Sequence, residues 1–220
     1  MIYPVSQFDL PFAANGGERL LLDNTDALLM PNPIEERILI DGRVCPWWFA
    51  YTFDNPLRRW LHNPRKILGA YVNEGDMAVD IGCGMGPFTA GLARLVGSNG
   101  RVIAVDLQEE MLQRVKTRVT KAGLADRVEL HRCQPESLGL AVAADFILAF
   151  WMAHEAPEAG PFFEQIAGLL KEGGRFLLVE PKGHVGQDDF QHEVEAVQAA
   201  GLSVKEWPKI TISRAALFSK

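Results

Sequence analysis

Residues 78–89 of this 220-residue chain, AVDIGCGMGPFT, decide how the rest of the sequence is interpreted. A short apolar run ends at the acid Asp80, three alternating glycines follow, and a pattern with helical spacing begins at Pro87. Glycine suits positions where the backbone takes a positive φ or where a ligand approaches the backbone closely. A helix start also presents unpaired N–H groups. The stretch therefore predicts a strand, a tight turn and a helix that together hold a nucleotide-like ligand.

A regular alternation of apolar patterns continues from residue 76 to the end of the chain. We predict strands at 77–81, 102–105, 128–131, 145–150 and 175–180, and helices at 87–96, 108–122, 161–170 and 188–200. Two final strands, at 203–207 and 211–219, are separated too briefly for a crossover helix, so this pair has to be antiparallel. The pattern predicts an α/β fold with a doubly wound, mostly parallel sheet and one reversed strand.

The first 62 residues have a different composition, rich in proline and aromatic residues. Asn-Pro pairs at 32–33, 55–56 and 63–64 combine a helix cap with a proline at the first helical position. They predict short helices near 33–40 and 56–62 and a longer one over 64–72. We interpret residues 1–62 as an appendage that forms a helical and aromatic lid, and residues 63–220 as the main domain.

Composition restricts the class of protein and of partner. The 22 Lys and Arg stand against 28 Asp and Glu, a formal net charge of −6, which makes nucleic acid a poor partner. The three cysteines Cys45, Cys83 and Cys133 are widely spaced, as in a protein with reduced thiols. The sequence has no recognisable secretory signal and no apolar run long enough for a membrane span, so we expect a cytoplasmic protein.

The spacing of the glycines separates two kinds of nucleotide site. Gly82, Gly84 and Gly86 alternate and lack the Gly-x-Gly-x-x-Gly arrangement of dinucleotide folds. Asp80 would repel a pyrophosphate, whereas it suits a ligand with an ammonium or sulfonium group. Asp106 ends the second predicted strand about twenty residues after the last glycine, where a carboxylate can accept both hydroxyls of a ribose. A simple helix cap is the alternative role of Asp106.

With these features the sequence resembles the class I S-adenosylmethionine-dependent methyltransferases over roughly residues 64–220. Residues 79–86, 102–106 and 145–151 resemble the first, second and fourth motifs of that family, and residues 169–176 its helix–strand join near the fifth. The resemblance implies seven strands in the order 3-2-1-4-5-7-6 with strand 7 antiparallel. It also implies S-adenosylmethionine as the cofactor, S-adenosylhomocysteine as the product, and no metal.

The resemblance carries roles over to individual cofactor-binding residues. The three glycines line the methionine and the ribose, Asp106 holds the ribose hydroxyls, and Leu107 packs on the adenine. Phe150 offers its backbone carbonyl to the amino group. The third motif departs from the commoner form, since residues 133–136 read CQPE where an Asp often meets the adenine amine, and Gln134 is our candidate there. The implied set is Asp80, Gly82, Gly84, Gly86, Asp106, Leu107, Gln134 and Phe150.

The segment after the fourth predicted strand holds the catalytic candidates. His154 is the first candidate for a general base, and Glu155 either orients it or senses the acceptor. The alternative is that His154 caps or packs the next helix. After the fifth strand, His184 and Glu180 form a second polar cluster, for which a solvated loop is the alternative.

Aromatic residues supply candidates for the acceptor wall. Trp47 and Trp48 in the lid and Trp151 after the fourth strand are our choices, with plain packing of the appendage as the alternative. His62, together with Arg58 and Arg59, is a candidate for binding an acidic acceptor.

The predicted function is transfer of a methyl group to a small molecule at an O, N or C atom activated by deprotonation. Three alternatives stay open: a non-catalytic S-adenosylmethionine-binding protein, a methyltransferase acting on protein or RNA, and a nicotinamide-dependent oxidoreductase on a related sheet. The sequence leaves open the acceptor and whether the chain forms a homodimer.

Overall fold

The computed structural model describes residues 61–220 of the chain. The predicted helix near 33–40, the aromatic candidates Trp47 and Trp48, and the lid 1–62 except its last two residues therefore lie outside the described residues. The same holds for Arg58 and Arg59, and for most of the predicted helix 56–62.

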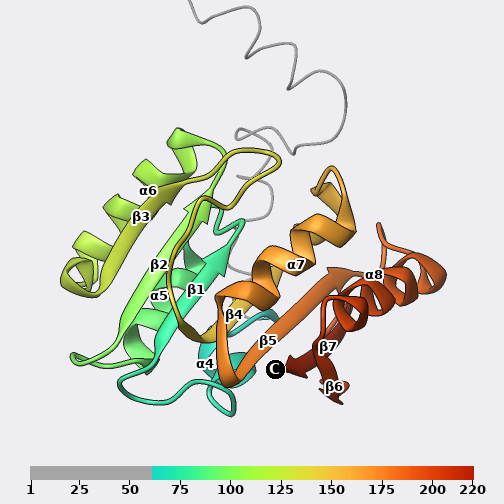
Figure 1. The fold of residues 1–220 in the computed structure, drawn as a ribbon. Helices are drawn as coiled ribbons and strands as arrows, with labels where there is room; N and C mark the ends of the chain where they lie inside the picture. Colours follow the sequence, from blue (N-terminus) through green and yellow to red (C-terminus); the bar gives the residue numbers. More distant parts are fainter. Residues whose placement is uncertain (1–60) are drawn as a thin grey trace, which may run out of the picture.

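A seven-stranded sheet with the strand order β3-β2-β1-β4-β5-β7-β6 forms the centre of the molecule (Figure 1). Neighbouring strands are parallel from β3 to β5, and β7 is antiparallel to both β5 and β6. The predicted strand order and the reversed strand are confirmed. The strands are β1 (Met77–Ile81), β2 (Arg101–Asp106), β3 (Val128–Arg132), β4 (Ala144–Phe150), β5 (Leu170–Pro181), β6 (Ser203–Glu206) and β7 (Ser213–Ser219).

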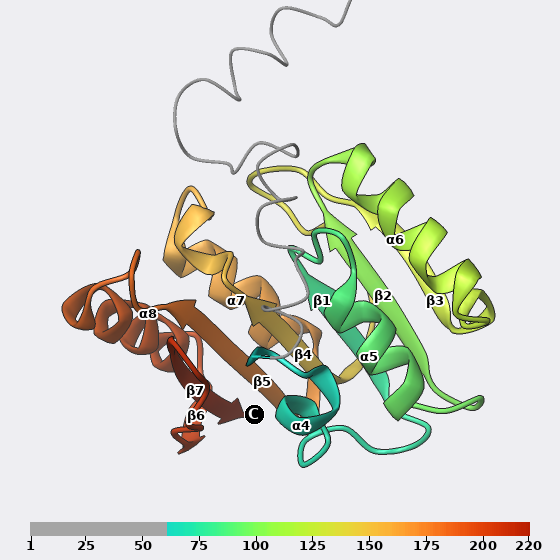
Figure 2. The same ribbon diagram turned by 180° about the vertical axis from the view of Figure 1, so that it is seen from behind.

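Helices cover both faces of the sheet (Figure 2). One face packs against α4 (Pro64–Leu68), α5 (Pro87–Leu95) and α6 (Glu109–Lys121), the other against α7 (Ala159–Leu169) and α8 (Gln187–Ala199). Two 3₁₀ turns, η1 (Ala125–Arg127) and η2 (Ala153–Glu155), complete the elements. Along β1, Val79 and Ile81 belong to the α7–α8 core and Ala78 to the other core. Burial on both faces explains why this strand is continuously apolar apart from Asp80.

The predicted longer helix over 64–72 is wrong in length. α4 begins as expected, with Asn63 Oδ1 accepting hydrogen bonds from the backbone N–H groups of Arg65 (3.0 Å) and Lys66 (3.3 Å). It ends at Leu68, and Gly69 forms its C-cap. Tyr71 and Val72 lie beyond the helix but are buried in the core. These two side chains are apolar because they are buried in the core, without being part of a helix.

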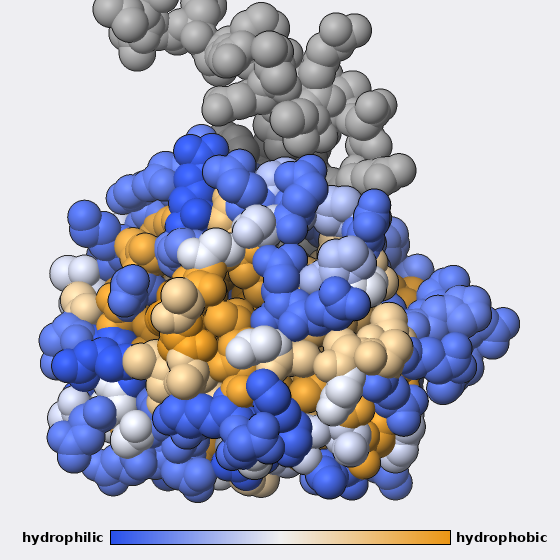
Figure 3. All heavy atoms as spheres, in the orientation of Figure 1, coloured by the Kyte–Doolittle hydropathy of each residue, from blue (hydrophilic) through white to orange (hydrophobic). Residues whose placement is uncertain are grey.

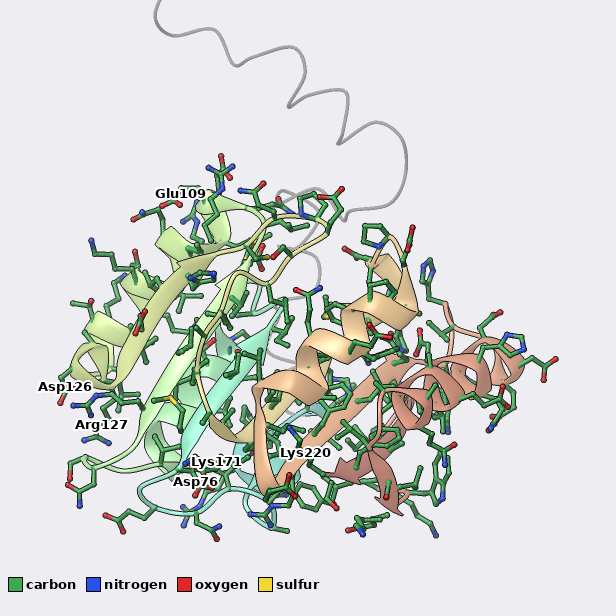
Figure 4. All side chains as sticks on the ribbon, in the orientation of Figure 1. Asp76, Glu109, Asp126, Arg127, Lys171 and Lys220 are labelled. Atoms are coloured by element: carbon green, nitrogen blue, oxygen red, sulfur yellow. The ribbon has the colours of Figure 1, made fainter. Side chains whose placement is uncertain are left out.

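β5 is also longer than predicted, because it begins at Leu170, directly after α7. Lys171, the second residue of β5, donates from Nζ to both carboxylate oxygens of Asp145 (2.8 and 2.7 Å). Asp145 also accepts a hydrogen bond from the N–H of Met77 (2.9 Å). Lys220 Nζ donates to the carbonyls of Ala167 and Leu170. Figure 4 shows both lysines at the same end of the sheet. These lysine hydrogen bonds lie at the amino ends of β4 and β5, away from the predicted site.

Apolar side chains gather on the face shown in Figure 3. A groove of about 400 Å³ there is lined by α7 residues, the start of β5 and the segment 138–143. It too lies beside the amino ends of β4 and β5. Within residues 61–220, no helix is long and apolar enough to cross a membrane.

Candidate active site

The glycine loop lies between the carboxyl end of β1 and the start of α5. Gly82, Gly84 and Gly86 have φ angles of +64°, +51° and +75°, which confirms the expected left-handed backbone. The loop is held against β2 by a hydrogen bond from the N–H of Cys83 to the carbonyl of Val105 (3.0 Å). A Cβ atom at Gly84 would meet nothing within 4 Å. The loop therefore combines a fixed conformation with an open approach to the backbone, as a bound nucleoside requires.

Gly86 is a stability-critical member of this loop, and Gly86→Ala is expected to lower the free energy of unfolding by about 2–5 kcal/mol. A side chain in the left-handed region costs roughly 1–2 kcal/mol, and overpacking adds roughly 1–3 kcal/mol. The new Cβ would lie 2.9 Å from Val115 Cγ2 and 3.3 Å from Val115 Cα. Urea unfolding measures the change.

Gly123→Ala is the matched control for this variant. Gly123 has a φ of +67°, but its Cβ would meet nothing within 4 Å, so that only the conformational part of the loss remains. Equal losses in the two variants would contradict the role given to the contact between Gly86 and Val115.

Asp106 lies at the carboxyl end of β2 and contacts the glycine loop. Its Oδ2 accepts a hydrogen bond from the N–H of Gly84 (2.9 Å), and its Oδ1 accepts one from the N–H of Gln108 (3.0 Å). The side chain is buried, and this burial raises the pKa of its carboxyl, although the backbone hydrogen bonds oppose the rise. Oδ1 retains a second lone pair, and the second lone pair of Oδ2 faces the weak Sγ–H donor of Cys83 at 4.0 Å, where a stronger hydroxyl donor can replace it. Asp106 can thus hold the loop and still accept hydrogen bonds from two ligand hydroxyls.

Asp80 is the other acid of the loop, and it is almost completely buried in β1. Thr89 Oγ1, in the first turns of α5, donates a hydrogen bond to its Oδ2 (2.6 Å). Burial, reinforced by the charge of Asp106 and opposed by the Thr89 hydrogen bond, raises the pKa of Asp80 to about 7. Near neutral pH this carboxyl therefore changes its charge readily, and a nearby cationic ligand would favour its ionised form.

The remaining cofactor candidates lie around the same strand ends. Leu107 follows β2 and is partly buried against the core. Gln134 is exposed and forms a tight turn with Ser137, with backbone hydrogen bonds of 2.9 and 3.2 Å between them. Phe150 ends β4, and its buried ring stacks on Phe88 with the centroids 4.1 Å apart. All three stay candidates for contacts with the adenine or the amino group.

His154 forms a short polar contact at this edge of the sheet. It lies in η2, directly after β4, and its Nδ1 lies 2.6 Å from Oε2 of Glu180 at the end of β5. Glu180 is completely buried, and its Oε1 accepts from the N–H groups of Ala153 (2.8 Å) and His154 (3.3 Å). For Glu180 the solvated-loop interpretation is therefore wrong. A carboxylate held in this way fixes the orientation of the imidazole and directs Nε2 away from Glu180.

Three acids act on the imidazole of His154. Burial lowers its pKa, but the hydrogen bond and charge of Glu180, followed by the charges of Glu155 and Glu193, outweigh burial and raise the pKa. The exposed His184 places its ring 4.7 Å from that of His154, in an edge-on arrangement. The structure thus brings His154, Glu155 and His184 together. Glu180 provides the orienting hydrogen bond that we had considered for Glu155.

Trp151, the third aromatic candidate, contacts β7 and His62. Its indole Nε1 donates to Ser213 Oγ at the start of β7 (3.0 Å), and its ring meets that of His62 edge-on at 5.0 Å. His62 is itself buried, with Nε2 2.9 Å from the carbonyl oxygen of Thr211. Trp151 also has a φ of +62°, which is uncommon for a bulky residue. The indole is held towards β7 and the α4 face of the sheet by Ser213 and His62.

The sequence gives weak signals for two carboxylates of the site, Glu193 and Glu180. Glu193 was not singled out, because a glutamate on an amphipathic helix ordinarily faces solvent. Glu180 was noted only as part of a loop cluster. An acid among the apolar residues of a buried strand, as in the run 176–180 (FLLVE), is the signal that could have identified Glu180. In the part of the chain that the structure describes, no group of three or more His, Cys, Asp or Glu residues is arranged to hold a metal ion.

Comparisons with known proteins show the family to which the chain belongs. A family model described as a methyltransferase domain matches residues 73–212. The chain is 32% identical over 127 residues to the carboxy-S-adenosyl-L-methionine synthase of Dichelobacter nodosus. This match covers 54% of this chain and 51% of that protein. It is 29% identical over 110 residues to the ubiquinone/menaquinone biosynthesis C-methyltransferase of Klebsiella pneumoniae, covering 50% and 44%. The chain thus spans about half the length of the curated relatives it matches.

A solved structure shows the same fold. The crystal structure of an S-adenosylmethionine-dependent methyltransferase from Aquifex aeolicus matches with a TM-score of 0.72 and 24% sequence identity, over 80% of this chain and 98% of that chain. The residues matched by the family model include the glycine loop, Asp106, His154 and Glu180. The chain therefore belongs to the methyltransferase domain family, and its resemblance to the class I S-adenosylmethionine-dependent methyltransferases is confirmed at the level of family and fold.

Proposed function

We propose that the protein transfers a methyl group from S-adenosylmethionine to a small-molecule acceptor whose nucleophilic atom must lose a proton. The observation that carries this proposal is the pair of the partly buried His154 and the buried Glu180, which lies at the same edge of the sheet as the glycine loop. The carboxyl ends of parallel strands β1, β4 and β5 meet at that edge. Ligands of doubly wound sheets bind there.

The residues of the chain fit the cofactor. The left-handed glycines leave the backbone open at Gly84, Asp106 has lone pairs for the ribose hydroxyls, and Asp80 provides a carboxyl suited to a cationic group. When bound, S-adenosylmethionine supplies an electrophilic methyl carbon on a sulfonium, and the electron pair of the broken carbon–sulfur bond remains on the sulfur. The protein then has to align the acceptor and exclude water.

His154 is the proposed catalytic base of the transfer. Glu180 accepts the Nδ1–H hydrogen bond, so that Nε2 of the neutral imidazole carries the lone pair. Nε2 takes the proton of the acceptor, and the electron pair of that O–H, N–H or C–H bond forms the new bond to the methyl carbon. Glu180 stabilises the imidazolium that results. Trp47, Trp48, Trp151 and His184 remain proposed acceptor contacts.

A small molecule is the favoured acceptor because the formal charge of −6 offers no general attraction for a phosphate backbone. The name of the Klebsiella relative places its own reaction in quinone biosynthesis, which is small-molecule chemistry. A protein or RNA acceptor is an outcome of the test below.

Product analysis of the cofactor tests the proposed function. The full chain is incubated with S-adenosylmethionine and, separately, with fractions of small metabolites, RNA and protein, and mass spectrometry follows the cofactor. Formation of S-adenosylhomocysteine with a metabolite fraction is the expected result. Binding without any product would support the non-catalytic alternative. Thermal stabilisation by NAD(H) in place of S-adenosylmethionine would overturn the proposal in favour of an oxidoreductase.

Binding of S-adenosylmethionine near pH 7 is expected to release protons from the protein. Asp80 has a pKa of about 7 without ligand, so it is about half protonated there, and a cationic ligand beside it lowers the pKa. Calorimetric titrations in two buffers of different ionisation enthalpy measure the release. Asp80→Asn should abolish it. Equal release in the variant would place the proton on another group and contradict this role of Asp80.

A further inference from the structure

The backbone of the glycine loop is held by hydrogen bonds from several directions. The N–H of Cys83 donates to β2, and the N–H of Gly86 donates to the carbonyl of Cys83 within the loop (3.0 Å). A further bond comes from a side chain that the proposed mechanism does not use. Nε of Arg118 on α6 donates to the carbonyl oxygen of Met85 at 2.7 Å. Met85 lies between the left-handed Gly84 and Gly86, so this bond acts on the part of the backbone that gives the loop its shape.

The helix α6 supplies two contacts to this loop from one of its faces. It lies on the same face of the sheet as α5 (Figure 2). Val115 and Arg118 are three residues apart and therefore neighbours on the surface of α6. Val115 is completely buried and lies where a Cβ atom on Gly86 would collide with it. Next to this apolar contact, Arg118 adds a charged hydrogen-bond donor.

The direction of the Arg118 side chain follows from its helix. Helical side chains extend towards the N-terminal end of their helix, and α6 begins shortly after β2 ends, at the edge of the sheet that holds the site. The side chain is partly buried and bonds to a residue 33 positions away in the sequence. Tertiary packing, and not the local sequence, therefore brings Arg118 to the loop.

The bond favours one conformation of the loop. A guanidinium keeps its charge, and a charged donor forms a stronger hydrogen bond than a neutral one. A different backbone conformation between Gly84 and Gly86 would move the carbonyl of Met85 away from this donor. The bond therefore stabilises the left-handed arrangement of the glycines against other arrangements of the loop.

We infer that Arg118 is a positioning residue of the cofactor site, which holds the glycine loop in the conformation that receives the ribose and the methionine of S-adenosylmethionine. This inference rests on the proposed place of the cofactor at the loop. Arg118 acts through the carbonyl of Met85 and not through a contact with the ligand. When a loop holds its binding conformation for a smaller fraction of the time, the apparent dissociation constant rises by the inverse of that fraction.

Calorimetry with S-adenosylmethionine on the full chain tests the inference without knowledge of the acceptor. Arg118→Met keeps the aliphatic part of the side chain but removes the donor. It should weaken binding about 10-fold, as for a loop that holds the binding conformation about a tenth of the time. Arg118→Lys keeps the charge and a donor, so it should recover most of the affinity. Wild-type affinity in folded Arg118→Met would overturn the inference.

Arg127→Met is the matched control. Nη1 of Arg127 donates to the carbonyl of Ala93 (3.2 Å), which lies in the last turn of α5, at the other end of that helix from the glycine loop. Both variants thus remove an arginine donor that bonds to a distant backbone carbonyl. Arg127→Met should leave S-adenosylmethionine binding unchanged. An equal loss of affinity in the two variants would indicate general destabilisation and overturn the specific role of Arg118.

A direct contact between Arg118 and the carboxylate of the ligand is the alternative cause of weaker binding. 5′-Methylthioadenosine separates the two causes, because it has the ribose and the adenine but lacks the amino-acid part of the cofactor. If Arg118 holds the loop, Arg118→Met should bind both molecules more weakly than the wild type does. A loss confined to S-adenosylmethionine would overturn the inference.

A measurement on the wild type covers the case in which Arg118→Met fails to fold. NMR follows the Nε–H signals of the arginine side chains, and the conservative Arg118→Lys assigns the signal of Arg118. Saturation with S-adenosylmethionine should slow the exchange of this proton with water, because the ligand stabilises the loop conformation in which the bond forms. An unchanged exchange rate would overturn the inference.

Asp106→Ala separates this inference from the proposed function. Weaker binding in Asp106→Ala, together with wild-type affinity in Arg118→Met, would refute the role of Arg118 alone. Wild-type affinity in both variants would refute the proposed place of the cofactor as well. Weaker binding in Arg118→Met, without S-adenosylhomocysteine formed from any acceptor fraction, would support the inference and refute the proposed methyl transfer.

Discussion

Asp106→Ala is expected to weaken S-adenosylmethionine binding by at least about 100-fold. A hydrogen bond to a charged group contributes roughly 1.5–3 kcal/mol, and the proposed role of Asp106 gives it two ribose hydroxyls. The variant also leaves the N–H groups of Gly84 and Gln108 without their acceptor, so the loop that faces the ligand is loosened as well. Calorimetry or equilibrium dialysis on the full chain measures the affinity.

Two further variants separate the parts of this effect. Asp106→Asn keeps one carbonyl acceptor and nearly the same shape, so it should retain more affinity than the alanine variant. Asp126→Ala removes an exposed acid in η1, away from the glycine loop in Figure 4, and should leave binding unchanged. If the affinity of Asp106→Ala for S-adenosylmethionine stays within about twofold of the wild-type affinity, the proposed ribose contact is refuted.

His154→Asn is expected to reduce turnover by roughly 10²–10⁴-fold, the usual contribution of a general base. Asparagine can still donate a hydrogen bond from the position of Nδ1, so Glu180 keeps a partner, whereas alanine would leave a buried carboxylate oxygen unpaired. Affinity for S-adenosylmethionine and the melting temperature should therefore stay close to wild type. The rate of S-adenosylhomocysteine formation with an active acceptor fraction is the measurement.

The pH dependence of turnover gives the same residue a second signature. A protonated imidazole cannot take a proton from the methyl acceptor. Wild-type turnover therefore falls as the pH is lowered through the pKa of His154. Because Glu180 raises this pKa, the fall begins at a higher pH than for an ordinary histidine. His154→Asn should lack this limb. His192→Ala, at an exposed position on α8, serves as the control, and a similar loss of turnover in that variant would contradict a specific role for His154.

Much of the fold could be predicted because its signals are local. The period of apolar residues, the helix-ending glycines and the short link between the last two strands depend on neighbours in the chain. The Asn63 cap and the three positive φ angles of the glycine loop are of this kind, and both are confirmed. The prediction of a helix over 64–72 was wrong because Tyr71 and Val72 are apolar for a different reason, burial against the core.

The features of the site likewise fall into those with a local sequence signal and those that depend on the tertiary structure. The sequence by itself determined the loop at residues 82–86, because close approach of backbone and ligand demands particular residues at fixed spacing. Through the resemblance of its motifs to a known family it also implied the strand order. Only the tertiary structure decided the partner of His154, since Glu180 lies 26 residues further along the chain and reaches it through the parallel pairing of β4 and β5. It likewise turned Trp151 towards Ser213 and buried Glu193 on α8. Burial and the pairing of distant strands determine the surroundings of these side chains, and neither can be predicted from the spacing of residues along the chain.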